Sequence, residues 1–348
     1  MYPFRVFVSY SHEDLGLVER VVDRLQKMKL HPIIDRNIRP GIPFSDQIKD
    51  DIAHAHLFLA VLTKTSVKRP WVHQETGYAM GMGVPVLPLA IGGQLPGQML
   101  QDLQALRVRQ DLSDLGRRIQ EANLEHLVRE ATDRSSGAME CADLSEERTA
   151  GIVKHCLAWR RIGGEGRVRQ KAALSSFCIP PEWSQKVWQV YDGDEPRSEY
   201  SHRLLRRERK ELGRFAEASG CDLIVSPSLT LTHRGRASKI IRLEKLRDFL
   251  KSMQGKARVV IRDEPSGENL LIVGDWFVAE SKSLRRGEGY RHTTFTYHAP
   301  TVLERLRRFD EEFQELLDEA GCDGESSRIE AIKRIEKEIS KERRKTKA

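Results

Sequence analysis

Several features are absent from this sequence, and each absence excludes a class of protein. No apolar run approaches the ~20 residues that cross a membrane as a helix. The first residues, Met1–Phe4, lack the charged and apolar regions of a signal peptide. The five cysteines lie far apart without a CxxC pair, which favours reduced thiols over disulfides or structural zinc. We therefore expect a cytoplasmic chain with no membrane partner.

Motifs for bound metals and cofactors are also missing. The glycines at Gly81–Gly83 and Gly163–Gly166 do not have the spacing of a dinucleotide-binding or P-loop motif, and neither set follows a strand as such motifs require. His12, His73 and the later histidines show no spacing typical of metal ligands. We expect neither a metal nor a resident cofactor.

Length and charge set broad limits. With 348 residues, two domains are expected rather than one, since domains usually span roughly 100–200 residues. Hydrophobic residues make up 39% of the chain, enough for an ordinary buried core. The formal net charge of +7 permits an acidic partner without indicating one, because a scattered charge excess is usually a solvated surface.

The first third of the chain alternates apolar runs with amphipathic segments. Strands are predicted at 5–10, 31–35, 56–62 and 85–91, and helices at 17–28, 44–55 and 70–81. Residues 97–129 are expected to be mostly helical, with a short strand near 106–109. This alternation predicts a parallel, doubly wound α/β sheet with right-handed crossovers.

One stretch, 69–79, combines a helix signal with reactive side chains. Pro70 suits the first turn of a helix, and Gly81 and Gly83 end it before the next strand. Trp71 and Glu75 are four residues apart and so share a helical face. The helix follows a predicted parallel strand, whose carboxyl end is where ligands bind in such sheets. A carboxylate there can stabilise the positive charge that develops when a bond to a sugar anomeric carbon breaks.

These motifs together resemble the TIR (Toll/interleukin-1 receptor) domain family, in particular its prokaryotic branch. The resemblance is carried by Ser9-Tyr10-Ser11 at the end of the first strand, the loop with Asp35-Arg36 and Pro40-Gly41, and the WxxxE pattern of Trp71 and Glu75. It implies a flavodoxin-like parallel-sheet domain over residues 1–130. It also implies an NAD⁺ nucleosidase that releases nicotinamide and forms ADP-ribose or a cyclic isomer, with NAD⁺ as substrate rather than cofactor, in an immune or anti-phage effector.

The resemblance also suggests roles for individual residues, each with a simpler alternative. Glu75 is the candidate catalytic carboxylate, and its alternative is a solvated helical glutamate. The substrate-binding candidates are Ser9, Tyr10, Ser11, Arg36, Ser66 and Trp71. Their alternatives are strand-end capping, turn formation and core packing. Arg39, Pro40 and Gly41 belong to a predicted self-association loop, which implies a homo-oligomer. Arg69 departs from the family, which often has a small hydroxyl residue there.

The rest of the chain matches no family that the sequence reveals. Residues 131–164 are interpreted as a linker, 165–322 as a second mixed α/β or α+β domain of sensory or regulatory role, and 323–348 as a charged amphipathic tail helix. A basic helix at 200–218 presents Arg203, Arg206, Arg207 and Lys210. This face is either solvated or receives a nucleotide, a nucleic acid or an acidic protein.

Two other functions therefore compete with an NAD⁺-cleaving enzyme. A non-catalytic adaptor would use the first domain only to recruit other proteins. A nucleic-acid-binding regulator would act through the second domain. A carboxylate at position 75 favours the enzyme, because an adaptor has no need of one there.

Overall fold

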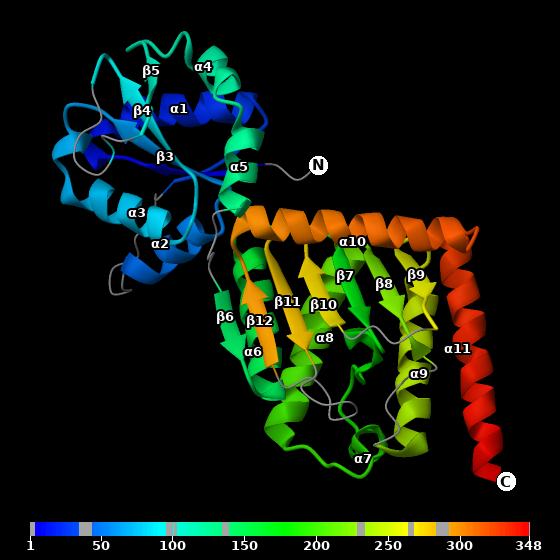
Figure 1. Ribbon diagram of the computed structural model, residues 1–348. Coiled ribbons are helices and arrows are strands. Elements are labelled where there is room, and N and C mark those ends of the chain that lie inside the picture. Colours follow the sequence, from blue (N-terminus) through cyan, green and yellow to red (C-terminus); the bar gives the residue numbers. More distant parts are fainter. Residues whose placement is uncertain are drawn as a thin grey trace. The chain divides into compact units, whose positions relative to one another are not determined.

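The computed structural model describes residues 4–34, 44–94, 100, 103–133, 139–227, 234–263, 268–282 and 292–347. The chain folds into two units (Figure 1). The first comprises residues 1–139 and a short segment, 296–304, from late in the chain. The second comprises residues 140–295 and 305–348.

The first unit is built on a five-stranded sheet of order β2-β1-β3-β4-β5, in which every neighbouring pair is parallel. Its strands are β1 (Arg5–Ser9), β2 (His31–Ile33), β3 (Leu57–Leu62), β4 (Val86–Ile91) and β5 (Leu106–Val108). Its helices are α1 (Leu15–Lys27), α2 (Phe44–Ala53), α3 (Pro70–Gly81), α4 (Leu115–Glu121) and α5 (Leu124–Asp133). The predicted flavodoxin-like parallel sheet is confirmed.

Helices cover both faces of this sheet. This is required because successive apolar side chains of β1 point to opposite faces. Val6 and Val8 point into one apolar cluster with α1, α4 and α5, whereas Phe7 points into the other cluster with α2 and α3. Phe7 stacks on Phe58 of β3 with ring centroids 5.6 Å apart. Burial on both sides explains why the central strands read as continuous apolar runs.

The second unit contains a seven-stranded mixed sheet of order β6-β12-β11-β10-β7-β8-β9 (Figure 1). Strands β7, β8 and β9 are parallel, and β10 is antiparallel to both β7 and β11. The strands are β6 (Met139–Ala142), β7 (Val168–Ala172), β8 (Cys221–Val225), β9 (Ala257–Ile261), β10 (Glu268–Val273), β11 (Phe277–Lys282) and β12 (His292–Thr296). The predicted mixed α/β character of this region is confirmed.

Six helices of the described chain complete or flank this unit: α6 (Ser145–Arg161), α7 (Gln185–Asp192), α8 (Glu199–Ser219), α9 (Gly235–Ser252), α10 (Ala299–Glu319) and α11 (Gly324–Lys347). The segment 131–164, interpreted above as a linker, differs from that interpretation, because it contains β6 and α6. Helix α6 buries Ile152, Cys156 and Trp159, and the Trp159 ring stacks on Trp276 with centroids 4.7 Å apart. The predicted tail helix corresponds to α11.

A buried carboxylate joins three neighbouring segments at β8. Asp222 is fully buried, and two guanidinium groups donate to it. Arg258 donates to its two oxygens at 2.7 and 2.9 Å, and Arg167 donates at 2.7 and 3.0 Å. Burial alone would raise the pKa of Asp222, but the hydrogen bonds from Arg258 and Arg167 outweigh it and hold the pKa below its usual value.

A buried histidine ties the late segment 296–304 into the first unit. His298 is fully buried, with Nε2 lying 2.9 Å from the carbonyl oxygen of Gly83, just beyond α3. Its Nδ1 lies 2.9 Å from Thr301 Oγ1. Burial lowers the pKa of His298, and the hydrogen bond to Gly83 offsets only part of that effect.

This arrangement predicts a pH-dependent loss of stability. The pKa of His298 in the folded protein lies below its pKa in the unfolded chain, which is about 6.5. Its contribution to the free energy of unfolding is therefore complete above pH 6.5 and is lost as the pH falls toward the folded pKa. The protection factors of amides in α3, corrected for the pH dependence of intrinsic exchange, should therefore fall between pH 7 and pH 5.5 more in the parent than in His298→Gln. Identical pH dependence in the two proteins would contradict the prediction.

Candidate active site

Helix α3 carries the candidate catalytic residue and begins and ends where the sequence predicts. Arg69 is its N-cap residue, with extended backbone angles (φ −93°, ψ 118°), and Pro70 occupies the first turn, where its missing N–H costs nothing. Beyond the helix, Gly83 has φ +72°, a left-handed conformation that glycine adopts without steric cost. The chain then turns into β4.

Glu75 lies in the middle of α3, and its side chain is nearly removed from solvent. It is 6% exposed, and the hydroxyl of Ser9 donates a hydrogen bond to its Oε2. Ser9 is the last residue of β1, so the contact forms at the carboxyl end of a central strand. Burying a carboxylate costs free energy unless its oxygens are hydrogen-bonded, and the Ser9 hydroxyl supplies one such bond.

The hydrogen-bond partner of Ser9 differs from the partners expected from the sequence. Sequence reasoning offered dinucleotide binding or strand-end capping, and the structure directs the hydroxyl to Glu75 instead. The two residues are 66 positions apart in the sequence, so no local pattern could reveal the pair.

Trp71 lies one helical turn before Glu75 and is partly exposed. It packs against the apolar cluster that includes Phe7, Phe58 and Ala79. The packing role that sequence analysis offered as the alternative is therefore visible in the structure.

Ser66 forms a turn at the end of β3 rather than pointing into an open site. It is fully buried, its Oγ accepts from the Thr63 amide at 2.8 Å, and its own amide donates to Thr63 Oγ1 at 3.0 Å. The Thr63 hydroxyl donates in turn to Asp14 Oδ2 at 2.6 Å. Sequence reasoning missed Thr63 and Asp14, although Thr63 directly follows a predicted parallel strand.

The other residues at the end of β1 are also buried. Tyr10 belongs to the cluster on the α1 face of the sheet, and its ring meets His12 edge-on with centroids 5.7 Å apart. Ser11 accepts the Asp14 amide through its carbonyl oxygen at 2.7 Å. Tyr10 and Ser11 therefore have structural contacts of their own.

Arg69, the departure from the family pattern, pairs with Glu13 at the entrance to α3. Both side chains are at least half exposed, so we expect this ion pair to contribute little to stability. The remaining candidates of the first unit, Arg36, Arg39, Pro40 and Gly41, lie outside the described residues.

The predicted basic face of α8 is divided by the fold. Arg203, Arg207 and Lys210 are exposed along one stripe, with Arg203 paired to Glu199 at 3.4 Å. Arg206 instead lies over the Trp183 ring, 5.6 Å from its centroid. Three of the four predicted ligand-face residues thus share a surface, and the fourth packs on an aromatic ring.

The described part of the chain lacks two further features. It contains no group of three or more His, Cys, Asp or Glu side chains able to hold a metal ion. None of its helices is both long enough and apolar enough to span a bilayer.

The fold of the first unit agrees with the comparison to known families. Residues 6–128 match the family model described as a TIR domain. The first unit contains a TIR domain. No curated protein matches the sequence.

Three solved structures show distant similarity. A CMP N-glycosidase from Clostridium botulinum is 17% identical, with 34% of this chain and 98% of that chain covered and a TM-score of 0.28. A metazoan TIR-STING receptor from C. gigas is 13% identical, with 75% and 89% covered and a TM-score of 0.26. An archaeal chromatin protein is 11% identical, with 59% and 64% covered and a TM-score of 0.28. Scores this low carry no argument about fold or function.

Proposed function

We propose that this protein is a TIR-domain NAD⁺ glycohydrolase, acting as an immune or anti-phage effector under the control of its second unit and of self-association. The observation that carries the proposal is the placement of Glu75. A carboxylate on the helix that follows β3 is buried and is hydrogen-bonded by the last residue of β1.

This placement suits cleavage of the nicotinamide–ribose bond. The leaving pyridinium is already cationic and departs as neutral nicotinamide, so the reaction needs little acid catalysis. The ribose becomes oxocarbenium-like, and one carboxylate beside it stabilises that charge. The hydrogen bond from Ser9 to Oε2 helps to hold the Glu75 carboxyl group in place.

A non-catalytic adaptor explains the same site less well. A scaffold that only recruits other TIR domains gains nothing from a carboxylate that is costly to bury. The direct test is to incubate the full chain with NAD⁺ over a range of protein concentrations and to measure free nicotinamide. We expect release, with a rate per molecule that rises with concentration as the TIR domains associate. No nicotinamide at any concentration, with and without crowding agents, would favour the adaptor.

Removing the Ser9 hydroxyl should slow the reaction without weakening substrate binding. Ser9→Ala removes one hydrogen-bond donor to the Glu75 carboxylate and weakens the restraint on its orientation, so we expect kcat to fall about tenfold with KM changed less than threefold. The matched control is Ser113→Ala, which changes an exposed serine beyond β5. A rise in KM with kcat unchanged would instead assign Ser9 to substrate binding.

A further inference from the structure

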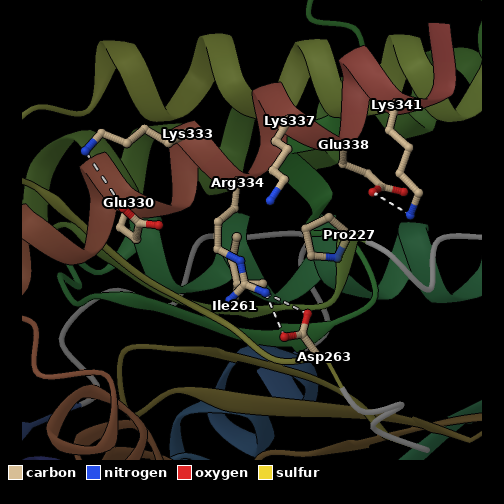
Figure 2. A pocket seen from close by; sticks show the side chains of 9 residues that line it. All are labelled: Pro227, Ile261, Asp263, Glu330, Lys333, Arg334, Lys337, Glu338 and Lys341. Carbon is tan, nitrogen blue, oxygen red and sulfur yellow. Dashed lines mark hydrogen bonds and ion pairs between the residues drawn. The ribbon is translucent and has the colours of Figure 1, made fainter. Parts of the chain in front are cut away.

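The second unit has a pocket of about 570 Å³ at the carboxyl ends of two parallel strands. Pro227 lies just beyond β8 and Asp263 just beyond β9, and helix α11 forms the opposite wall. The lining residues, drawn in Figure 2, are Pro227, Ile261, Asp263, Glu330, Lys333, Arg334, Lys337, Glu338 and Lys341. The carboxyl edge of parallel strands is where open α/β sheets bind ligands, and this volume lies within the usual range of about 300–1,000 Å³ for ligand sites.

Helix α11 presents a regular stripe of charged residues to this pocket because its apolar stripe is anchored in the unit. Ala331, Ile335 and Ile339 are buried, and Ser327 accepts the Val259 amide of β9 at 3.3 Å. The neighbouring stripe follows helical spacing and comprises Glu330, Lys333, Arg334, Lys337 and Lys341. Packing therefore determines which cations line the space.

The carboxylates of the pocket already have cationic partners. Glu338 accepts from the buried Lys239 Nζ at 2.7 Å, and Lys239 lies outside the lining. Both oxygens of Asp263 accept from one nitrogen, Nη2 of Arg334, each at 2.7 Å. The Asp263 charge is thus matched within the pocket, and the Glu338 charge is largely matched from outside it.

Lys337 supplies the charge that remains. Within the part of the chain that the structure describes, no ion pair or hydrogen bond to its amine is found. Figure 2 shows its amine directed into the space between Arg334 and Pro227. The amine of Lys333 lies 3.9 Å from the Glu330 carboxylate, and that of Lys341 lies 3.4 Å from the Glu338 carboxylate. Because these ion pairs are long, both amines can turn toward an incoming anion.

The lining also indicates which anion fits. Among the described residues that line the pocket none is aromatic, so these residues offer no surface for stacking a nucleobase. Lysine amines and a guanidinium are the usual partners of phosphate oxygens. Because the cations extend over about two turns of α11, a single phosphate cannot reach them all. We propose that this pocket binds a compact anion with two or more phosphate groups, independently of NAD⁺ cleavage by the TIR domain.

The test uses the full chain with two probes, inorganic pyrophosphate and ADP, and measures dissociation constants by titration calorimetry at low ionic strength. Lys337→Gln should weaken pyrophosphate binding about tenfold, since it removes one charge-assisted contact. Lys337→Arg should keep affinity within about threefold of the parent, because the charge is retained. The matched control is Lys186→Gln, an exposed lysine of α7 outside the pocket, which should change nothing.

The two probes separate the sources of phosphate. Equal affinities for pyrophosphate and ADP, both lowered by Lys337→Gln, indicate a site for phosphate groups alone. Tighter binding of ADP, again lowered by Lys337→Gln, indicates a nucleotide as the natural source. The proposal is overturned if neither probe binds at millimolar concentration, if Lys337→Gln binds as the parent does, or if Lys186→Gln loses affinity equally.

Discussion

Glu75→Gln should remove most NAD⁺ cleavage while leaving the fold and substrate affinity nearly unchanged. Glutamine has the shape of glutamate, and its amide oxygen can still accept the Ser9 hydroxyl. What disappears is the negative charge that we propose stabilises the ribose. Losing one well-aimed electrostatic group commonly costs about 10²–10³ in rate, so we expect kcat to fall by that factor.

The measurement is nicotinamide release at saturating NAD⁺, together with the melting temperature of each protein. Glu125→Gln, which neutralises an exposed carboxylate in the first turn of α5, is the matched control and should retain full turnover. A kcat of Glu75→Gln within a few-fold of the parent value would contradict the assignment of Glu75 as the catalytic residue.

The largest stability effect should come from Asp222→Ala in the second unit. The substitution leaves two guanidinium groups, Arg167 and Arg258, without the buried carboxylate that both contact. Breaking a buried ion pair by removing one partner typically costs about 3–5 kcal/mol. Because the arginine side chains are 31% and 36% exposed and can regain water, we expect about 3 kcal/mol.

Urea unfolding followed by tryptophan fluorescence measures this effect, since Trp159, Trp183, Trp188 and Trp276 all belong to the second unit. Asp248→Ala, which removes a half-exposed carboxylate paired with Arg247, is the control and should cost less than 1 kcal/mol. The lowered pKa of Asp222 adds a pH signature. The contribution of Asp222 to the free energy of unfolding is present above its pKa in the unfolded chain, about 3.9, and is lost as the pH falls through its pKa in the folded protein. Equal destabilisation by the two variants would contradict this account.

The elements of the first unit were predictable because each strand and helix there has its own local signal. Strand β3 is a continuous apolar run, α1 repeats apolar residues at helical spacing, and α3 begins at a proline and ends before a glycine. Parallel order follows from the alternation of these elements, since right-handed crossovers leave few other topologies.

Strand β7 shows why the second unit was harder to predict. Its five residues, Val168–Ala172, are all buried, yet three of them are charged or polar. Arg169 and Lys171 pair with Asp310 and Glu312 of α10, whereas Gln170 turns to Ser176. The side chains of β7 alternate between the two faces of the sheet, as in any strand. Its charged side chains, however, are neutralised by residues up to 141 positions away. Hydrophobic periodicity therefore cannot detect it.

The sequence alone determined the strands and helices of the first unit, including the helix that carries Trp71 and Glu75, and the amphipathic stripe of α11, because these depend on interactions within a few turns or one strand. Only the tertiary structure decided that Ser9 contacts Glu75, that α6 and β6 occupy the expected linker, and that Lys337 faces a pocket. Each of these depends on segments far apart in the chain, and their contacts arise from packing of the whole unit rather than from any local preference of the residues involved.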